Sequence, residues 1–167
     1  MTVLDEIESC IPALRRYAHA LLRNRDEAED LVQDCLERAL ARRNHWRGDG
    51  PVRAWLFRIL LNRFRDDRRS AATRAHLVLL DDTADLKQSG GQEAHLDLRE
   101  VHAAIGRLPH DQRAALLLVA LEGMSLAEAS RVLEIPEGTL ASRLARARLA
   151  LRAMTMRDGV THVLGRK

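Results

Sequence analysis

Apolar residues recur at helical spacing in three stretches of the first 70 residues. The first covers residues 11–22, and we expect Pro12 to lie in the first turn of its helix, where proline is tolerated. In the second, residues 28–40, apolar side chains are three or four positions apart. A break at residues 48–51 precedes the third, residues 52–64. This spacing predicts three amphipathic helices in the N-terminal part of the chain.

The helical spacing fades between residues 71 and 95, where polar residues and a Ser-Gly-Gly sequence replace it. We expect a flexible linker here. Helix resumes near Leu96 and ends at Pro109, and an Ala- and Leu-rich helix then covers residues 111–121. The side chains expected to face the core from the first of these two helices are Leu98, Val101, Ile105 and Leu108.

The two helices that follow have the clearest boundaries. Ser125 and Glu128 have the spacing of a capping box, in which a hydroxyl and a carboxylate satisfy free backbone amides at a helix start. A tight connection at residues 134–138 leads to a last helix over residues 139–154. Its apolar residues share a narrow arc and predict a buried face: Leu140, Leu144, Ala147 and Leu151. The pattern therefore predicts a helix, a short turn and a helix.

The composition favours an all-α protein. Of the 167 residues, 46% are hydrophobic and only 3% aromatic, which suits helical cores built on Leu and Ala. Together with the long polar stretch, this predicts two small helical domains, each with its own core, joined by a flexible linker. Cys10 and Cys35 lie on apolar or amphipathic stretches, so we interpret them as small buried hydrophobes. Because no secretion signal or membrane-spanning run is found, we expect a soluble, cytoplasmic protein without membrane insertion.

Positive charge is concentrated in two segments. Residues 138–157 hold five arginines and no acid, and residues 53–69 hold six arginines against two aspartates. A polyanionic partner touched at two places would suit this distribution, and so would two solvated helix faces. On the last helix, hydroxyls and arginines project opposite the apolar arc, a combination that can read the major groove. The candidate DNA-binding residues of this face are Thr139, Ser142, Arg143, Arg146 and Arg148.

A second polar face lies on the helix that begins after residue 51. Its candidate nucleic-acid-binding residues are Arg58, Asn62, Arg65 and Arg69. Just before this helix, a polar loop flanked by glycine carries an aromatic ring that could stack on an unpaired base. The loop consists of Asn44, His45, Trp46 and Arg47. Ordinary core packing of Trp46 is the alternative interpretation.

The exposed side of the second helix is acidic. It carries Asp26, Asp30, Gln33, Asp34 and Glu37. DNA would repel this face, so it is either solvated or docks on a basic protein surface. The sequence contains no motif for catalysis, for a cofactor or for a metal, and no two of its seven histidines have a metal-binding interval on one helix.

Three stretches, in this order, resemble the extracytoplasmic-function (ECF, group 4) RNA polymerase sigma factors. Residues 26–34 (DEAEDLVQD) are similar to the region 2 helix that binds the clamp of the polymerase beta-prime subunit. Residues 54–69 are similar to the helix used at the minus-10 promoter element, and residues 122–144 to the region 4 helix-turn-helix used at the minus-35 element. The domains implied are region 2 at residues 1–70, a linker at 71–95, region 4 at 96–154 and a tail at 155–167.

The resemblance implies a role for each candidate site. The acidic second helix would bind core polymerase, whose contacts include the beta-prime clamp and the beta flap. Residues 44–47 and the arginine face of the third helix would bind minus-10 DNA, and the polar face of the last helix minus-35 DNA. A protein of this kind performs no bond chemistry, needs no cofactor and is controlled by an anti-sigma factor. Residues 92–113 are also similar to the alphaproteobacterial general-stress subgroup, and Glu134 occupies a turn position often taken by Gly in the family.

Other functions fit parts of the sequence. A stand-alone helix-turn-helix transcription regulator would explain the C-terminal half, but it leaves the acidic face and the Trp46 loop without a purpose. A sigma-like decoy that only sequesters an anti-sigma factor would not need the arginines of the last helix. An enzyme acting on nucleic acid is a third alternative, for which the sequence offers no candidate residues.

Overall fold

The computed structural model describes residues 1–77 and 94–157. Within these ranges the chain folds into seven α-helices and one short 3-10 helix, without a β-strand, so the prediction of an all-α protein is confirmed. The elements are α1 (Val3–Leu22), α2 (Arg25–Arg42), η1 (Arg43–His45), α3 (Val52–Leu77), α4 (Ala94–Arg107), α5 (His110–Ala120), α6 (Leu126–Leu133) and α7 (Glu137–Arg157).

The start of α1 differs from the sequence prediction. The helix begins at Val3 because Thr2 and Asp5 form a capping box, in which the Thr2 hydroxyl accepts a hydrogen bond from the Asp5 amide and the Asp5 carboxylate accepts one from the Thr2 amide. Pro12 therefore lies inside the helix, and the expectation that it occupies the first turn is wrong. Pro12 is on the exposed side, where water can bind the carbonyl that its missing N–H leaves free.

Helices α1, α2 and α3 form the N-terminal half of the molecule. Helices α1 and α2 lie side by side, and α3 packs against both. The largest fully buried side chains of this half include Tyr17, Phe57 and Leu60, and the Tyr17 and Phe57 rings meet edge to face with their centroids 5.2 Å apart. Cys35 is also fully buried, as expected, whereas Cys10 is only half-buried.

The C-terminal half contains the predicted helix, turn and helix. Ser125 and Glu128 form the capping box at the start of α6, and all four residues of the predicted apolar arc of α7 are buried. The prediction for Leu98 is wrong, because its side chain is 66% exposed. Leu108, just after the end of α4, is buried as predicted, Val101 and Ile105 are half-buried, and Ala104 is the buried residue of α4 itself.

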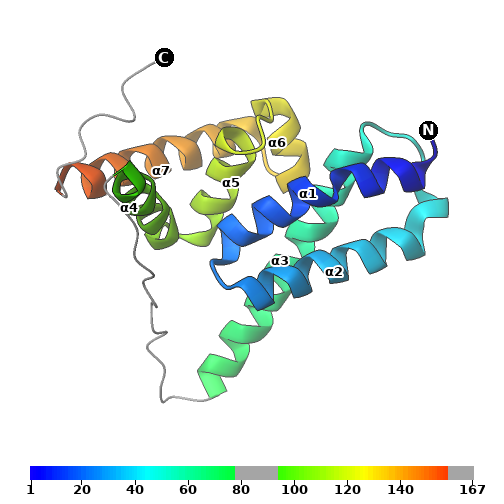
Figure 1. Cartoon of the computed structure of the whole chain (residues 1–167), viewed down its shortest axis with the longest axis horizontal. Coiled ribbons are helices and arrows are strands. Elements are labelled where there is room, and N and C mark those ends of the chain that lie inside the picture. Colours follow the sequence, from blue (N-terminus) through cyan, green and yellow to red (C-terminus); the bar gives the residue numbers. More distant parts are fainter. Residues whose placement is uncertain (78–93, 158–167) are drawn as a thin grey trace.

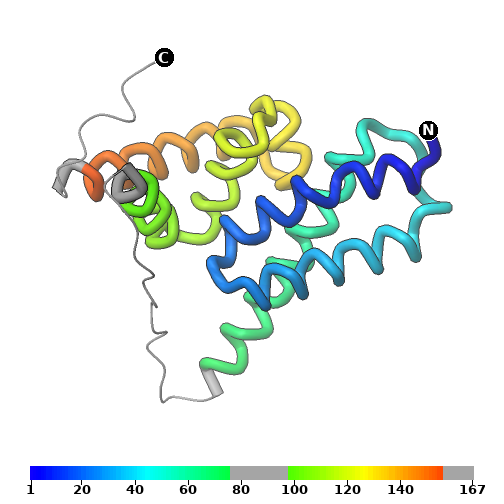
Figure 2. The backbone as a smooth tube through the Cα atoms, in the orientation of Figure 1, coloured from blue at the N-terminus to red at the C-terminus, as the bar shows by residue number. Residues whose placement is uncertain are grey.

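The two halves pack directly against each other. Helix α1 lies between α2 and α5, and α3 contacts α6, an arrangement that can be followed along the backbone in Figure 2. The buried side chains of both halves form one continuous cluster. Helical spacing predicts a separate core for each half, because it shows which face of a helix is buried and not what covers that face.

Helix extends into both ends of the segment expected to be a linker. Helix α3 continues to Leu77, beyond residue 70, and α4 begins at Ala94. Figure 1 shows the last turns of α3 projecting beyond the α1–α2 pair. The rest of the expected linker, residues 78–93, and residues 158–167 of the expected tail lie outside the described residues.

Candidate nucleic-acid interface

The polar face of α7 is open to solvent. Four of the five candidate residues on this helix are exposed: Thr139, Ser142, Arg146 and Arg148. Arg143 is half-buried, and its guanidinium lies 4.0 Å from the Asp111 carboxylate. The buried arc of Leu140, Leu144, Ala147 and Leu151 fixes which way the opposite face points. A second helix anchored in this way, with free hydroxyls and guanidiniums, has the chemistry needed to enter a DNA groove.

The turn that precedes α7 depends on one unusual residue. Glu134 closes the C-terminus of α6 with a left-handed backbone, at a φ of 56°. Its amide donates to the carbonyls of Ser130 and Arg131, so this conformation satisfies the end of the helix. The turn sets the angle between α6 and α7, and with it the direction of the α7 face.

Two of the candidate arginines on α3 reach toward the other half of the molecule, although the Arg58 side chain is still 41% exposed. The Arg65 guanidinium donates a hydrogen bond of 2.9 Å to the Leu133 carbonyl, which belongs to α6. The Arg58 Nε lies 3.9 Å from the Glu134 carboxylate. Asn62 is half-buried and Arg69 is exposed. The structure therefore brings Arg58 and Arg65 to the contact between the two halves, while Arg69 remains accessible.

In the loop before α3, Trp46 differs from its neighbours. Asn44, His45 and Arg47 are exposed. Trp46 is half-buried against the core, with its ring 6.4 Å from that of Trp55. Its indole Nε1 is buried and has no hydrogen-bond partner. In this conformation Trp46 packs partly against the core, but a buried indole N–H without a partner is not typical of an ordinary core side chain.

The acidic face of α2 borders a groove. Asp26, Asp30, Gln33 and Glu37 are exposed, and the half-buried Asp34 accepts a hydrogen bond of 2.9 Å from Arg63. The groove between α2 and α3 is lined by apolar side chains and by charges of both signs. The apolar residues include Leu22, Leu31 and Phe64, and the charged residues include Asp30, Asp34, Asp67, Arg63 and Arg68. A protein helix with an apolar stripe and charged flanks would complement such a groove.

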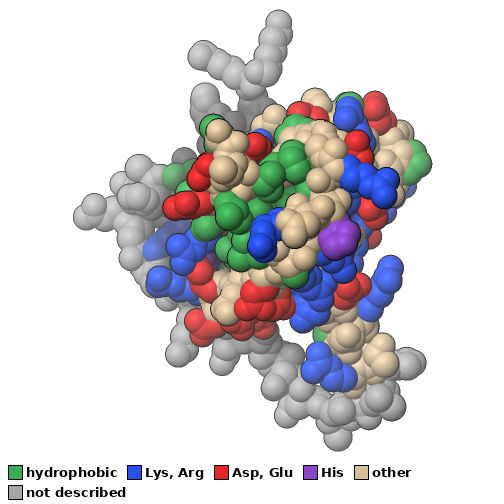
Figure 3. All heavy atoms as spheres, turned by 90° about the vertical axis from the view of Figure 1, so that its right-hand side faces the viewer, with side chains coloured by type: hydrophobic (Ala, Val, Ile, Leu, Met, Phe, Trp, Pro, Cys, Tyr) green, Lys and Arg blue, Asp and Glu red, His purple; other side chains and the backbone are tan. Residues whose placement is uncertain are grey.

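Charges of both signs share the surface at the end of the molecule where α1 begins. Figure 3 shows arginines and acids interspersed around an apolar strip on this face. Binding of nucleic acid here would therefore depend on particular side chains rather than on a uniform positive field. Among the described residues, no three His, Cys, Asp or Glu side chains are placed to hold a metal ion.

Two family models match this chain, one for each half. Residues 7–61 match the Sigma2 domain of PhyR, and residues 98–151 match Sigma-70, region 4. The ECF RNA polymerase sigma factor EcfG of Rhodopseudomonas palustris is 41% identical over 155 residues, which cover 93% of this chain and 86% of that protein. The chain belongs to the ECF RNA polymerase sigma factors. The sequence resemblance is thereby confirmed.

Other relatives of this sigma factor agree. The ECF sigma factor SigM of Mycobacterium tuberculosis is 35% identical over 83% of the chain and 69% of its own length. Among solved structures, the sigma factor RpoE from Bartonella quintana, in complex with the anti-sigma factor NepR, has a TM-score of 0.75 and 32% identity, and the match covers 92% of this chain and 96% of that one. CnrH, solved in complex with the cytosolic domain of CnrY, has a TM-score of 0.68 and 29% identity, with 93% and 88% covered.

Besides Arg58 and Arg65, residues that are not among the predicted site residues join the halves of this sigma factor. The Glu122 side chain, in the α5–α6 connection, is fully buried between Arg16 of α1 and Arg53 of α3. Near it, the Tyr17 hydroxyl donates a hydrogen bond of 2.8 Å to the Ala114 carbonyl. Arg113 also crosses between the halves and donates to the Leu21 carbonyl at 2.8 Å. These contacts join residues far apart in the chain, so helical spacing could not have identified them.

Proposed function

We propose that this sigma factor binds RNA polymerase core and directs it to promoters, using three of its surfaces. The acidic face of α2 and the adjoining groove bind the beta-prime clamp, and the C-terminal half contacts the beta flap. Helix α7 reads minus-35 DNA through Thr139, Ser142, Arg143 and Arg146, with Arg148 at a phosphate. The Asn44–Arg47 loop and the arginines of α3 bind the opening minus-10 strand.

The exposed polar face of α7 is the observation that carries this proposal. Its hydroxyls and the guanidiniums of Arg146 and Arg148 are exposed while the apolar arc behind them is buried, and residues 138–157 contain no acid that would repel phosphate. Arginine forks suit guanine edges, and small hydroxyl side chains let the backbone approach the bases. Any surface helix separates a buried from an exposed face, so it is the arginines and hydroxyls without acids, on the second helix of a capped helix-turn-helix, that favour DNA binding.

We infer that an anti-sigma factor controls the protein. RpoE and CnrH, the similar sigma factors described above, were solved in complex with NepR and with the cytosolic domain of CnrY. The likeness to EcfG and to the Sigma2 domain of PhyR supports a role in a general stress response. The sigma factor itself performs no bond chemistry and acts in the cytoplasm. No helix within residues 1–77 and 94–157 is long and apolar enough to cross a membrane.

Run-off transcription with purified core polymerase and matched variants tests the assignment of α7. Arg146→Ala removes a proposed groove contact, so product should fall roughly 5- to 150-fold, the loss that corresponds to about 1–3 kcal/mol for one good base contact. Arg107→Ala removes an exposed guanidinium from α4 and should leave product within about twofold of wild type, as expected for a surface change away from the DNA.

Two outcomes would overturn the assignment of this face. If Arg146→Ala and Arg107→Ala gave equal product, α7 would not be the reading helix. If adding an anti-sigma protein of the NepR kind left the product of the wild-type sigma factor unchanged, the inferred control would need a different partner.

A further inference from the structure

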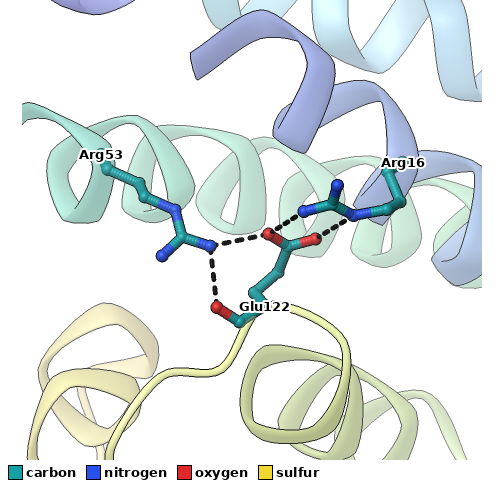
Figure 4. A network of polar contacts seen from close by, with 3 residues as sticks. All are labelled: Arg16, Arg53 and Glu122. Atoms are coloured by element: carbon teal, nitrogen blue, oxygen red, sulfur yellow. Dashed lines mark hydrogen bonds and ion pairs between the residues drawn. The ribbon is translucent and has the colours of Figure 1, made fainter. Parts of the chain in front are cut away.

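The contact between the halves centres on a carboxylate that is out of reach of water. The Glu122 side chain has no exposed surface. Arg16 binds it in a two-pronged arrangement, with Nε 3.1 Å from one oxygen and Nη2 2.9 Å from the other. Arg53 donates at 2.7 Å to the second oxygen and at 2.9 Å to the Glu122 carbonyl. Figure 4 shows the two guanidiniums reaching Glu122 from opposite sides.

All of these partners come from the other half of the molecule. Glu122 belongs to the C-terminal half, whereas Arg16 and Arg53 are on α1 and α3. A buried charge is tolerated only when it is paired and hydrogen-bonded. If the halves separated, Glu122 would exchange both guanidiniums for water. The pairing is therefore specific to the closed arrangement, and removing either side of it would leave a buried charge there without full compensation.

Further polar groups are satisfied in the same way. The fully buried Tyr17 hydroxyl has the Ala114 carbonyl as its acceptor. Arg113 is buried without a carboxylate, and its guanidinium donates to carbonyls at the ends of two helices, Leu21 on α1 and Ile105 on α4. Carbonyl groups at a helix C-terminus favour a cation, so Arg113 ties the end of α1 to the C-terminal half.

Closure affects the two proposed DNA-binding faces unequally. Arg65 donates to a carbonyl of α6, and Arg58 lies beside Glu134. Part of the α3 face that we propose to bind minus-10 DNA therefore contacts the other half of the molecule. On α7, Ser142 and Arg146 stay exposed. The closed molecule therefore holds Arg65 at the contact between the halves, whereas Arg69 of the same face and the polar face of α7 stay exposed.

We propose that Glu122 is a latch that holds the free sigma factor closed, so that the Arg65 guanidinium is withheld from DNA until a partner separates the halves. The functional meaning of the withheld residue rests on the proposed function, but the latch itself does not. On release, Arg16 and Arg53 become free cations on the N-terminal half, and Arg65 becomes available beside them.

Arginine modification with phenylglyoxal, mapped by mass spectrometry on the full chain without DNA or polymerase, tests the latch. In the wild-type protein Arg65 should react much more slowly than Arg146, which is exposed in the closed molecule and serves as the internal reference. Glu122→Gln replaces the carboxylate with a neutral amide. The amide has one acceptor oxygen in place of two and no negative charge to pair with the two guanidiniums. In this variant the reactivity of Arg65 should rise toward that of Arg146.

Controls separate opening from unfolding and from a general charge effect. Glu8→Gln removes the same charge from an exposed site on α1 and should leave Arg65 protected. Arg16→Met breaks the latch from the other side, and so tests it even if Glu122→Gln fails to fold. Small-angle scattering should show a larger radius of gyration for both latch variants than for Glu8→Gln, with unchanged helical content.

Two results would overturn the proposal. Equal reactivity of Arg65 and Arg146 in the wild-type protein would show that the halves are not held closed in solution. Continued protection of Arg65 in both latch variants would show that Glu122 is not what holds them. Because no DNA or polymerase is present, either result is independent of whether α7 reads a promoter.

Discussion

At Glu134 the chain adopts a left-handed backbone conformation, with a φ of 56°, that glycine takes without strain. A non-glycine residue in this region costs on the order of 1 kcal/mol. We predict that Glu134→Gly raises the free energy of unfolding by about 0.5–1 kcal/mol, measured by urea denaturation. Glu134→Ala, which keeps the strain, is the matched control. If the glycine variant is no more stable than the alanine variant, strain at this position is not significant.

His110 gives the protein a pH-dependent stability. It stands at the start of α5, with its ring 5.8 Å from that of Phe64. Burial, followed by the positive charges of Arg68 and Arg113, lowers the pKa of His110 from 6.5 to about 4, and Asp111 opposes the shift. Burial also lowers the pKa of His102. An unfolded chain would take up a proton on His110 near pH 6.5, whereas the folded chain does not.

The sign of this effect is fixed by the direction of the shift. Between pH 6.5 and about 4 the unfolded state binds more protons at His110, so the free energy of unfolding should fall as the pH falls through this window. Denaturation at pH 7.5, 6.5 and 5.5 should show the loss, and His110→Gln should reduce it. His45→Gln, at an exposed position, should not. Identical pH profiles for wild type and His110→Gln would contradict the assignment.

Helix α7 allows its two faces to be tested separately. Leu144 is only 2% exposed, so Leu144→Ala should lower the free energy of unfolding by about 2–5 kcal/mol through lost packing and a residual cavity. Ser142, two residues earlier, is exposed, and Ser142→Ala should change it by no more than about 0.5 kcal/mol. Thermal or urea unfolding measures both. Similar destabilisation by the two substitutions would mean that the faces are assigned incorrectly.

Local signals explain why some elements could be predicted from the sequence. The Ser125–Glu128 capping box and the apolar arc of α7 each define their element without help from distant residues. At α1, Pro12 is typical of a first helical turn, and this signal masks the capping box that Thr2 and Asp5 form at the actual start of the helix. A solvent-exposed helix has no apolar stripe to reveal it, which is why the continuation of α3 through exposed residues 70–75 was not expected.

Only part of the candidate site could be predicted from the sequence. Ser142 and Arg146 lie opposite the packed arc of a clearly bounded helix, so their exposure follows from spacing alone. The orientation of Arg58 and Arg65 does not, because it depends on which helix covers α3.

For the molecule as a whole, the decisive contacts join residues far apart in the chain. Glu122 binds Arg16 across 106 positions and Arg53 across 69. No periodic pattern relates such residues. The spacing of apolar residues within each half also gives no sign that the other half packs against it. The family could be identified from three local stretches, but the packing of one half on the other became visible only in three dimensions.

Run-off transcription that depends on this chain and on core polymerase together tests the central claim most directly. On promoter fragments that contain minus-35 and minus-10 elements, we predict product with core polymerase plus the chain and none with either alone, because core polymerase fixes the spacing of the two DNA-binding halves. Absence of product, combined with sequence-specific DNA binding by the free chain, would contradict the claim and would identify a stand-alone helix-turn-helix regulator instead.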